Sequence, residues 1–245
     1  MTLFGNIYYG IIYIMDIKMI IFDLGDTLIN YDCPLDWQSL CPLAIKQVIE
    51  VCNFSYSEEA NAKAQNILKK YNTRINFREY EVSSDIIFSE IFDEWKLSTE
   101  KLQLAKKTFY DYFQTNARCY EDTESTLQTL KNRGMKIGVL TDVAYGMDNE
   151  YALRDLIPIE KYIDICLTSR DVGFRKPNTK GYLMIQKSFD IPSNQITFVG
   201  NEEKDIIGAN NAGMISILID REDKIKDYLQ YYTINSLEDL CLKIF

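Results

Sequence analysis

The regular alternation of short apolar segments with amphipathic ones in the C-terminal half constrains the fold of this chain more than any other feature. Short apolar runs are typical of buried strands, and helical spacing separates the runs seen here. Strands that alternate with helices favour a parallel sheet covered by helices on both faces. The predicted strands are KIGVLT (136–141), IDICLT (163–168), QITFVG (195–200) and MISILID (214–220), and the predicted helices cover 145–156, 178–189 and 202–213.

A fifth strand, MIIFD (19–23), matches this sheet by composition, although more than a hundred residues separate it from KIGVLT. The intervening segment shows helical spacing, with Ser or Thr at plausible N-caps, and no comparable β run. We therefore predict an α/β fold: a Rossmann-like parallel-sheet core over 19–31 and 116–245, with an all-helical cap inserted over 32–115. The predicted cap helices are PLAIKQVIEVC, SEEANAKAQNILKKY, SSDIIFSEIFDEW and STEKLQLAKKTFYDYF, and YEDTESTLQTLKNRG (120–134) is predicted to return to the core as a helix.

The first eighteen residues form a predicted N-terminal extension that is apolar and aromatic. They lack a basic n-region, a cleavage site and the length to span a bilayer, so no signal peptide is predicted. A start codon placed upstream of Met15 or Met19 is one explanation, and a docked N-terminal strand is the alternative.

Composition excludes several classes of function. With 36 acidic and 27 basic residues the formal charge is −9, which disfavours nucleic acids and anionic membranes as partners. The absence of histidine removes Ser-His-Asp triads, HExxH zinc chemistry and any histidine base. Six cysteines without a CxxC pair indicate reduced packing residues and a cytoplasmic setting. We expect a monomer or homodimer that acts on a small molecule.

Four polar clusters follow the predicted strands, where open parallel sheets bind their ligands. An ionised aspartate such as Asp23 can attack phosphorus or carbon, and Thr141 can donate a hydrogen bond to a transferring oxygen. Lys176 supplies a cation, and Asp205 with Asp23 could hold Mg²⁺ through oxygen ligands. Each residue also has a structural explanation as a turn former, helix cap or solvated side chain. Their coincidence at successive strand ends favours a site for anionic-group transfer.

The same clusters resemble the motifs of the haloacid dehalogenase superfamily, subfamily I with a helical cap, over residues 19–220. The matching stretches are IIFDLGDTL, IGVLTD, DVGFRKPNTKGY and ITFVGNEEKDIIGANNAGM. The resemblance implies a mobile cap and an aspartyl-enzyme intermediate on Asp23; most relatives are Mg²⁺-dependent phosphatases. It further implies that Thr141 and Lys176 bind the phosphoryl group, that Asp205 serves the metal, and that Gly25 offers the metal a backbone carbonyl.

The sequence departs from the family pattern at three positions. Gly25 replaces the aspartate that protonates the leaving oxygen, a group typically worth about 10²–10⁴ in rate. Asp26 could substitute only if the loop turns sharply, because in an extended chain it would point away from Asp23. Asn201 replaces an acid of the fourth motif, which weakens Mg²⁺ binding although its amide oxygen remains a donor. Asp142, where relatives carry Asn, lies near the expected phosphate.

The leading hypothesis is a Mg²⁺-dependent phosphatase of a small phosphorylated metabolite, which would be slow if nothing replaces the acid missing at Gly25. The alternatives are a metal-independent haloacid dehalogenase and a protein that retained the fold for binding or regulation; a phosphomutase is least favoured. Glu202 could offset the loss of charge at the metal site. The candidate lid contacts in the cap are Phe77, Arg78, Tyr80 and Trp95. Aromatic residues at helical spacing are, however, typical of a hydrophobic core. No cap arginine is clearly placed to bind the carboxylate of a haloacid, which disfavours the dehalogenase.

Overall fold

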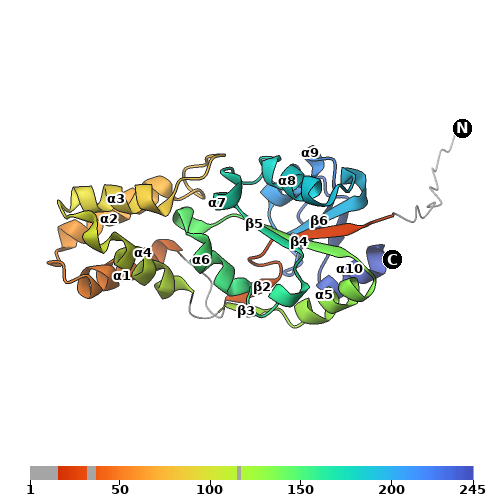
Figure 1. Cartoon of the computed structure of the whole chain (residues 1–245), viewed down its shortest axis with the longest axis horizontal. Helices are drawn as coiled ribbons and strands as arrows, with labels where there is room; N and C mark the ends of the chain where they lie inside the picture. Colours follow the sequence, from red (N-terminus) through yellow and green to blue (C-terminus); the bar gives the residue numbers. More distant parts are fainter. Residues whose placement is uncertain (1–15, 32–36, 115–116, 245) are drawn as a thin grey trace, which may run out of the picture.

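The sheet that the sequence predicts is present. The computed structural model describes residues 16–31, 37–114 and 117–244, so the predicted N-terminal extension lies almost wholly outside the described residues. Six strands run in the order β5–β4–β1–β6–β7–β8, and every neighbouring pair is parallel (Figure 1). They are β1 (Met19–Phe22), β4 (Lys136–Thr141), β5 (Ile165–Thr168), β6 (Ile196–Gly200), β7 (Ile215–Ile219) and β8 (Tyr232–Ile234).

Strand β1 lies at the centre of the sheet, and its four residues have no exposed surface. The chain continues to β4 on one side of β1 and reaches β6 on the other, so the strand order reverses beside β1. In parallel α/β sheets such a switch point opens a crevice at the carboxyl ends of the strands. The end of β1 is therefore where the topology itself places a ligand site.

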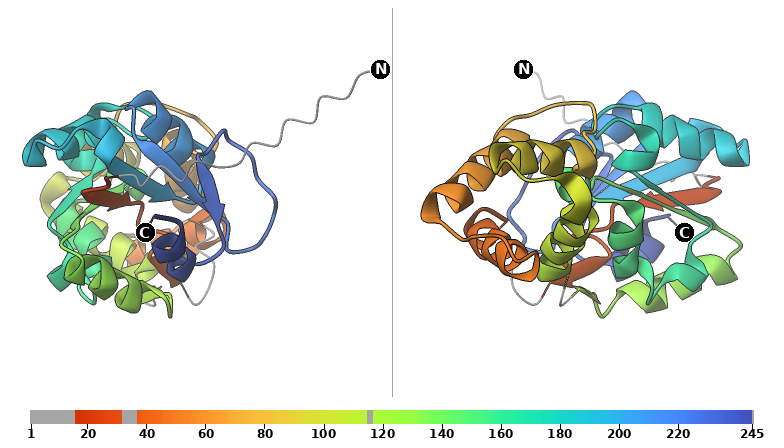
Figure 2. Two further views of the ribbon diagram at one scale, coloured as in Figure 1. Left: turned by 90° about the vertical axis from the view of Figure 1, so that its right-hand side faces the viewer. Right: turned by 60° about the vertical axis from the view of Figure 1, so that its left-hand side comes forward.

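Helices cover both faces of the sheet (Figure 2). Leu127 and Leu130 of α5 and Leu237 of α10 are buried in one cluster, whereas Tyr182 of α8 and Ala209 of α9 are buried in another. This confirms the predicted α/β architecture. The helices of the core are α5 (Thr123–Asn132), α6 (Asn149–Ala152), α7 (Ser169–Val172), α8 (Lys180–Phe189), α9 (Glu203–Asn211) and α10 (Leu237–Ile244).

The structure corrects the prediction of one helix over 145–156. That segment contains two 3₁₀ turns, Ala144–Gly146 and Leu153–Leu156, on either side of the short α6. Tyr145 and Gly146 have φ angles of +49° and +63°, which interrupt a right-handed helix. Strand β8 and α10 were not predicted. Strand β8 is only three residues long and half-exposed, which leaves no clear hydrophobic period.

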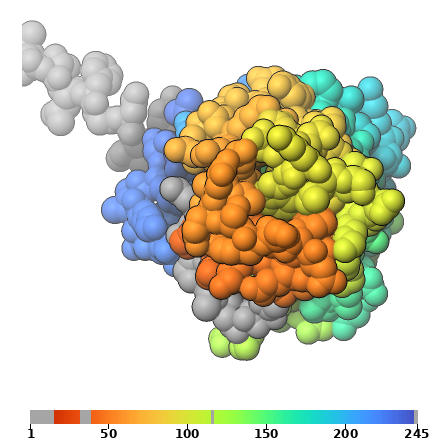
Figure 3. All heavy atoms as spheres, turned by 90° about the vertical axis from the view of Figure 1, so that its left-hand side faces the viewer, coloured from red at the N-terminus to blue at the C-terminus, as the bar shows by residue number. Residues whose placement is uncertain are grey.

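Four helices form a separate layer at one end of the molecule (Figures 1 and 3). They are α1 (Trp37–Val51), α2 (Glu58–Tyr71), α3 (Ser84–Glu94) and α4 (Leu102–Phe113), preceded by a 3₁₀ turn at Thr99–Lys101. The predicted N-caps are present on α2 and α3, where Ser57 and Ser83 accept hydrogen bonds from Ala60 N and Ile86 N. At the root of this cap, β2 (Ile29–Tyr31) pairs antiparallel with β3 (Ala117–Cys119), a pair too short to be predicted.

The cap packs on the core through a shared hydrophobic cluster. Val143, Tyr145 and Met147, which follow β4, are buried among the side chains of the cap helices. Gly146 allows the closest approach, because a Cβ there would lie 1.9 Å from the carbonyl oxygen of Val82. The cap is thus docked on the segment that follows β4.

A second contact joins the cap to the loop that carries Lys176. Glu81 N donates to Gly173 O at 3.0 Å, and Arg175 N donates to Glu79 O at 2.7 Å. The cap backbone around Tyr80 therefore pairs with the loop before Lys176 as two short antiparallel strands would. Among the helices in the described residues, none is long and apolar enough to cross a bilayer.

Candidate active site

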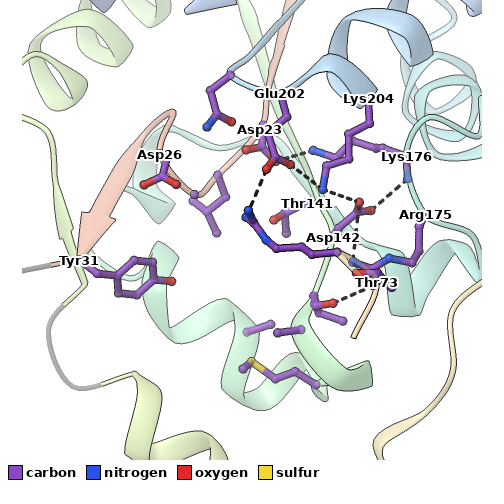
Figure 4. A pocket seen from close by; sticks show the side chains of 18 of the residues that line it. Asp23, Asp26, Tyr31, Thr73, Thr141, Asp142, Arg175, Lys176, Glu202 and Lys204 are labelled. Carbon is purple, nitrogen blue, oxygen red and sulfur yellow. Dashed lines mark hydrogen bonds and ion pairs between the residues drawn. The ribbon is translucent and has the colours of Figure 1, made fainter. Parts of the chain in front are cut away.

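A cavity of about 910 Å³ lies at the carboxyl edge of the sheet, between the core and the cap. Side chains from the ends of β1, β4 and β6 converge on it together with cap residues (Figure 4). Asp205 is fully buried and does not line the cavity. The residues predicted for the chemistry that line it are Asp23, Gly25, Asp26, Thr141, Asp142, Lys176, Asn201 and Glu202. Of the candidate lid contacts, Phe77 and Arg78 line the cavity, whereas Tyr80 is exposed outside the lining and Trp95 packs against the hydrophobic cluster of the cap.

Asp23 and Lys176 form the centre of the site. Asp23 follows β1 directly, and its N–H donates to Val199 O at 2.9 Å, which extends the pairing of β1 with β6. Lys176 Nζ lies 2.5 Å from Asp23 Oδ1 and 2.7 Å from Asp205 Oδ1. The lysine side chain is 1% exposed, whereas that of Asp23 is 11% exposed and reaches the cavity. The arrangement presents one carboxylate to a ligand and holds it with a buried cation.

Asp205 positions this pair from behind the cavity wall. Its Oδ2 accepts hydrogen bonds from the backbone N–H groups of Asn201 and Glu202 at 3.1 and 3.0 Å. Gly200 makes the close approach possible, because a Cβ there would lie 2.5 Å from the Asp205 side chain. Asp205 therefore fixes both Lys176 and the loop after β6.

Burial determines the protonation behaviour of these groups. Loss of hydration raises the pKa of Asp23 to about 7, because the attraction of Lys176 only partly offsets it and the charge of Asp205 adds to it. Burial alone would lower the pKa of Lys176, but Asp205 and Asp23 together raise it well above its ordinary value. Lys176 is thus a permanent cation next to a carboxylate that protonates easily.

A second charged cluster lies beside the first. Asp142 Oδ1 accepts the backbone N–H of Lys176 at 3.1 Å, and its Oδ2 lies 3.1 Å from Lys204 Nζ and 3.9 Å from Arg175. Although burial opposes it, Lys204 and Arg175 hold the pKa of Asp142 below its ordinary value. Asp142 therefore stays ionised and anchors the Lys176 loop to the end of β4. Lys204 also pairs with Glu202 at 2.8 Å.

The loop after Asp23 turns sharply, which is the condition that the sequence analysis set for Asp26 to reach the site. Asp26 has a φ angle of +56°, and its N–H donates to Ile29 O at 2.8 Å. Asp26 consequently lines the same cavity as Asp23, although it lies apart from the Asp23–Lys176 pair (Figure 4). Burial and the nearby charge of Glu202 raise the pKa of Asp26. A Cβ built on Gly25 meets no atom within 4 Å, so the place of the missing acid is open space.

Three oxygen donors beside the cavity suit a magnesium ion. They are the Asp23 carboxylate, the Gly25 carbonyl and the amide oxygen of Asn201, which lies 3.5 Å from Thr27 Oγ1. In the described residues no three His, Cys, Asp or Glu side chains are grouped so as to hold a metal. Mg²⁺ commonly uses one or two carboxylates and completes its shell with water and substrate phosphate. The donors therefore fit an ion that the substrate helps to hold.

The cap contributes charged residues that the sequence did not reveal. Glu81, whose side chain is 2% exposed, pairs with Arg175 and accepts a hydrogen bond from Ser169 Oγ at 2.6 Å. Arg175 NH1 also donates to Val143 O at 2.8 Å, so Glu81 ties together the loops after β4 and β5 and the loop before Lys176. Such a contact joins residues 94 positions apart and leaves no local pattern. Lys204, in contrast, belongs to a polar cluster that the sequence predicted, although no role was predicted for Lys204 itself.

The sequence matches one family model over residues 20–219, described as haloacid dehalogenase-like hydrolase. Among curated proteins, the glyceraldehyde 3-phosphate phosphatase of Methanocaldococcus jannaschii is 29% identical over 230 residues, with 91% of this chain and 95% of that protein covered. The pyrophosphatase PpaX of Bacillus mycoides is 25% identical over 218 residues, with 89% and 90% covered.

Solved structures share the fold over almost the whole chain. A 2-haloacid dehalogenase from Pseudomonas syringae aligns with a TM-score of 0.71 at 22% identity, covering 93% of this chain and 98% of that one. A HAD phosphatase from Thermococcus onnurineus aligns with a TM-score of 0.62 at 20% identity, covering 91% and 96%. At these identities the likeness concerns the fold.

Proposed function

The chain belongs to the haloacid dehalogenase-like hydrolase family, and on that premise we propose that it is a Mg²⁺-dependent phosphatase of a small phosphorylated metabolite. The observation that carries this proposal is the pairing of Asp23 with Lys176 at 2.5 Å in the wall of a cavity that Lys204 and Arg175 also line. A carboxylate cannot easily approach a phosphoryl group, because both are anionic, unless cations lie between or beside them. This site supplies those cations.

In the proposed reaction, Asp23 attacks the phosphorus atom and the bond to the ester oxygen breaks. The product alcohol leaves with a proton taken from a cavity acid or from water. Water then attacks the phosphorus of the aspartyl phosphate, which releases inorganic phosphate and restores the carboxylate. Lys176 holds the nucleophile in place, and Thr141 and Lys204 line the cavity where they can bind the phosphoryl oxygens.

We further propose that Asp23, the Gly25 carbonyl and Asn201 hold Mg²⁺, which would supply charge neutralisation at the phosphoryl group. Asp205 would act through Lys176 and through the backbone of Asn201. Because Asn201 removes one negative charge from the donor set, we expect metal affinity to rise when a phosphorylated ligand is present.

The proposal is tested by measuring phosphate release from a panel of phosphate monoesters with Mg²⁺ and with EDTA. We expect turnover that requires Mg²⁺ and is abolished in Asp23→Asn. The matched control is Asp93→Asn, because Asp93 is an exposed aspartate of α3 outside the cavity lining. Turnover by purified Asp23→Asn equal to that of the wild type would eliminate the assigned nucleophile.

The two alternatives predict different results in the same experiment. Halide release from a 2-haloacid that persists in EDTA would identify a dehalogenase. A melting temperature raised by phosphorylated ligands without any turnover would identify a binding protein.

A further inference from the structure

The cap wall of the cavity is built almost entirely by one loop. The lining residues of this loop begin at Tyr71, the last residue of α2, and among the described cap residues only Phe113 and Gln114 join them from elsewhere. Figure 4 shows Thr73 of this loop among the side chains that surround the cavity. The lining residues are Tyr71, Asn72, Thr73, Arg74, Ile75, Phe77 and Arg78.

Charge is distributed unevenly between the two sides of the cavity. The described cap residues that line it include two arginines and no acid, whereas every carboxylate in the lining comes from the core. The nucleophile and the lysines that surround it also belong to the core. Arg74 and Arg78 are therefore the cations that the described part of the cap offers to the part of a substrate that extends away from Asp23.

The partner of Arg74 is already neutralised by another cation. Arg74 NH2 lies 3.2 Å from Glu202 Oε1, but Glu202 Oε2 also pairs with Lys204 at 2.8 Å. The Arg74 side chain is 79% exposed, so this pairing contributes little by itself. Arg74 can transfer to an anionic ligand without leaving Glu202 unpaired.

Arg78 is a largely buried cation without a full set of acceptors. Its side chain is 9% exposed, and among the described residues Nε and NH2 have no hydrogen-bond acceptor. Glu81 Oε1 is 3.6 Å from NH2, and Glu81 already pairs with Arg175. A buried guanidinium in this state is costly unless an anion approaches it.

Local hydrogen bonds hold the loop that carries both arginines. Arg78 NH1 donates to Tyr71 O at 2.8 Å, and Asn76 Nδ2 donates to Lys69 O at 2.9 Å. Asn72 Oδ1 accepts the Arg74 N–H at 2.9 Å. Such local bonds fix the loop before a ligand binds, which lowers the entropic cost of recognition.

We propose that Arg74 and Arg78 form a subsite for a second anionic group, so that the substrate is a phosphate monoester whose alcohol part carries a carboxylate or a second phosphate. Arg74 contacts that group, and Arg78 supports it with a buried positive charge. This inference rests on the proposed phosphatase function and adds the substrate class.

Three substrates that share one carbon skeleton test the subsite. Glycerol 3-phosphate has a neutral end, 3-phosphoglycerate has a carboxylate there, and glycerol 1,3-bisphosphate has a phosphate. We expect kcat/KM to be about tenfold or more higher for at least one anionic member than for glycerol 3-phosphate, since hydrogen bonds to charged groups commonly contribute factors of about 10–100. The preferred anionic member identifies which anion the subsite takes.

Arg74→Gln and Arg78→Gln should each reduce this preference by about tenfold, and the double variant should remove it. The control is Arg133→Gln, because Arg133 is exposed after α5, outside the cavity lining, and its loss should leave the preference unchanged. A wild-type preference near one, or a preference that survives in both single variants, overturns the subsite.

A binding measurement separates failure of the subsite from failure of the enzymatic proposal. In Asp23→Asn, the preferred anionic ester should raise the melting temperature more than glycerol 3-phosphate does, and adding Arg74→Gln together with Arg78→Gln should remove the difference. If the wild type hydrolyses nothing but this difference persists, the phosphatase proposal fails and the subsite stands. If the wild type hydrolyses all three esters equally and shows no difference in binding, the subsite alone fails.

Discussion

Replacing Asp23 with Asn should stabilise the metal-free protein, and the stabilisation should grow with pH. Burial raises the pKa of Asp23 from 3.8 to about 7. The folded state therefore binds this proton more tightly than the unfolded state, so the wild type loses stability as pH rises between these two values. Each pKa unit corresponds to about 1.4 kcal/mol, which gives about 4 kcal/mol in total. Asn at this position does not titrate and avoids that loss.

The assay is equilibrium urea unfolding in EDTA, followed by circular dichroism at several values between about pH 4 and pH 8. Lys176 keeps its ion pair with Asp205 in the variant, at 2.7 Å in the present structure, so no buried cation is left alone. The free energy of unfolding of Asp23→Asn minus that of the wild type should rise by about 4 kcal/mol over this range. Asp93→Asn, at an exposed position outside the cavity lining, is the control substitution. A difference that stays flat, or that shrinks with rising pH, would refute the account of Asp23.

Three further substitutions test separate parts of the site and its support. Gly25→Asp places a side chain in open space and should increase phosphate release by about 10²–10⁴, measured as kcat with Mg²⁺, if a missing acid limits the rate. Lys176→Met leaves two buried carboxylates unpaired and should abolish hydrolysis while lowering the free energy of unfolding by about 3–5 kcal/mol at neutral pH. Gly146→Ala brings a Cβ within 1.9 Å of Val82 O and should lower the free energy of unfolding, measured with urea, by at least about 1–3 kcal/mol. Part of this loss comes from the positive φ angle of residue 146, which alanine adopts only with strain.

The nucleophile loop shows how far local sequence determines a site. The apolar run of β1 fixed the position of Asp23, because a buried central strand must end where the sheet meets solvent. The orientation of Asp26 could not be obtained in the same way, since the left-handed φ of +56° depends on a hydrogen bond to Ile29. The hydrophobic period carries no information about such a turn.

The sequence by itself determined the alternation of strands and helices, the order of the four polar clusters and the insertion of a helical cap. These follow from hydrophobic spacing and from the rule that parallel strands bring their carboxyl ends to one edge. Only the tertiary structure decided that Glu81 ties three core loops together and that Arg74 and Arg78 line the same cavity as Asp23. The physical reason is distance along the chain. Which charged residues of the cap and the core come into contact depends on how the two folded parts pack together. Contacts of this kind leave no local pattern in the sequence.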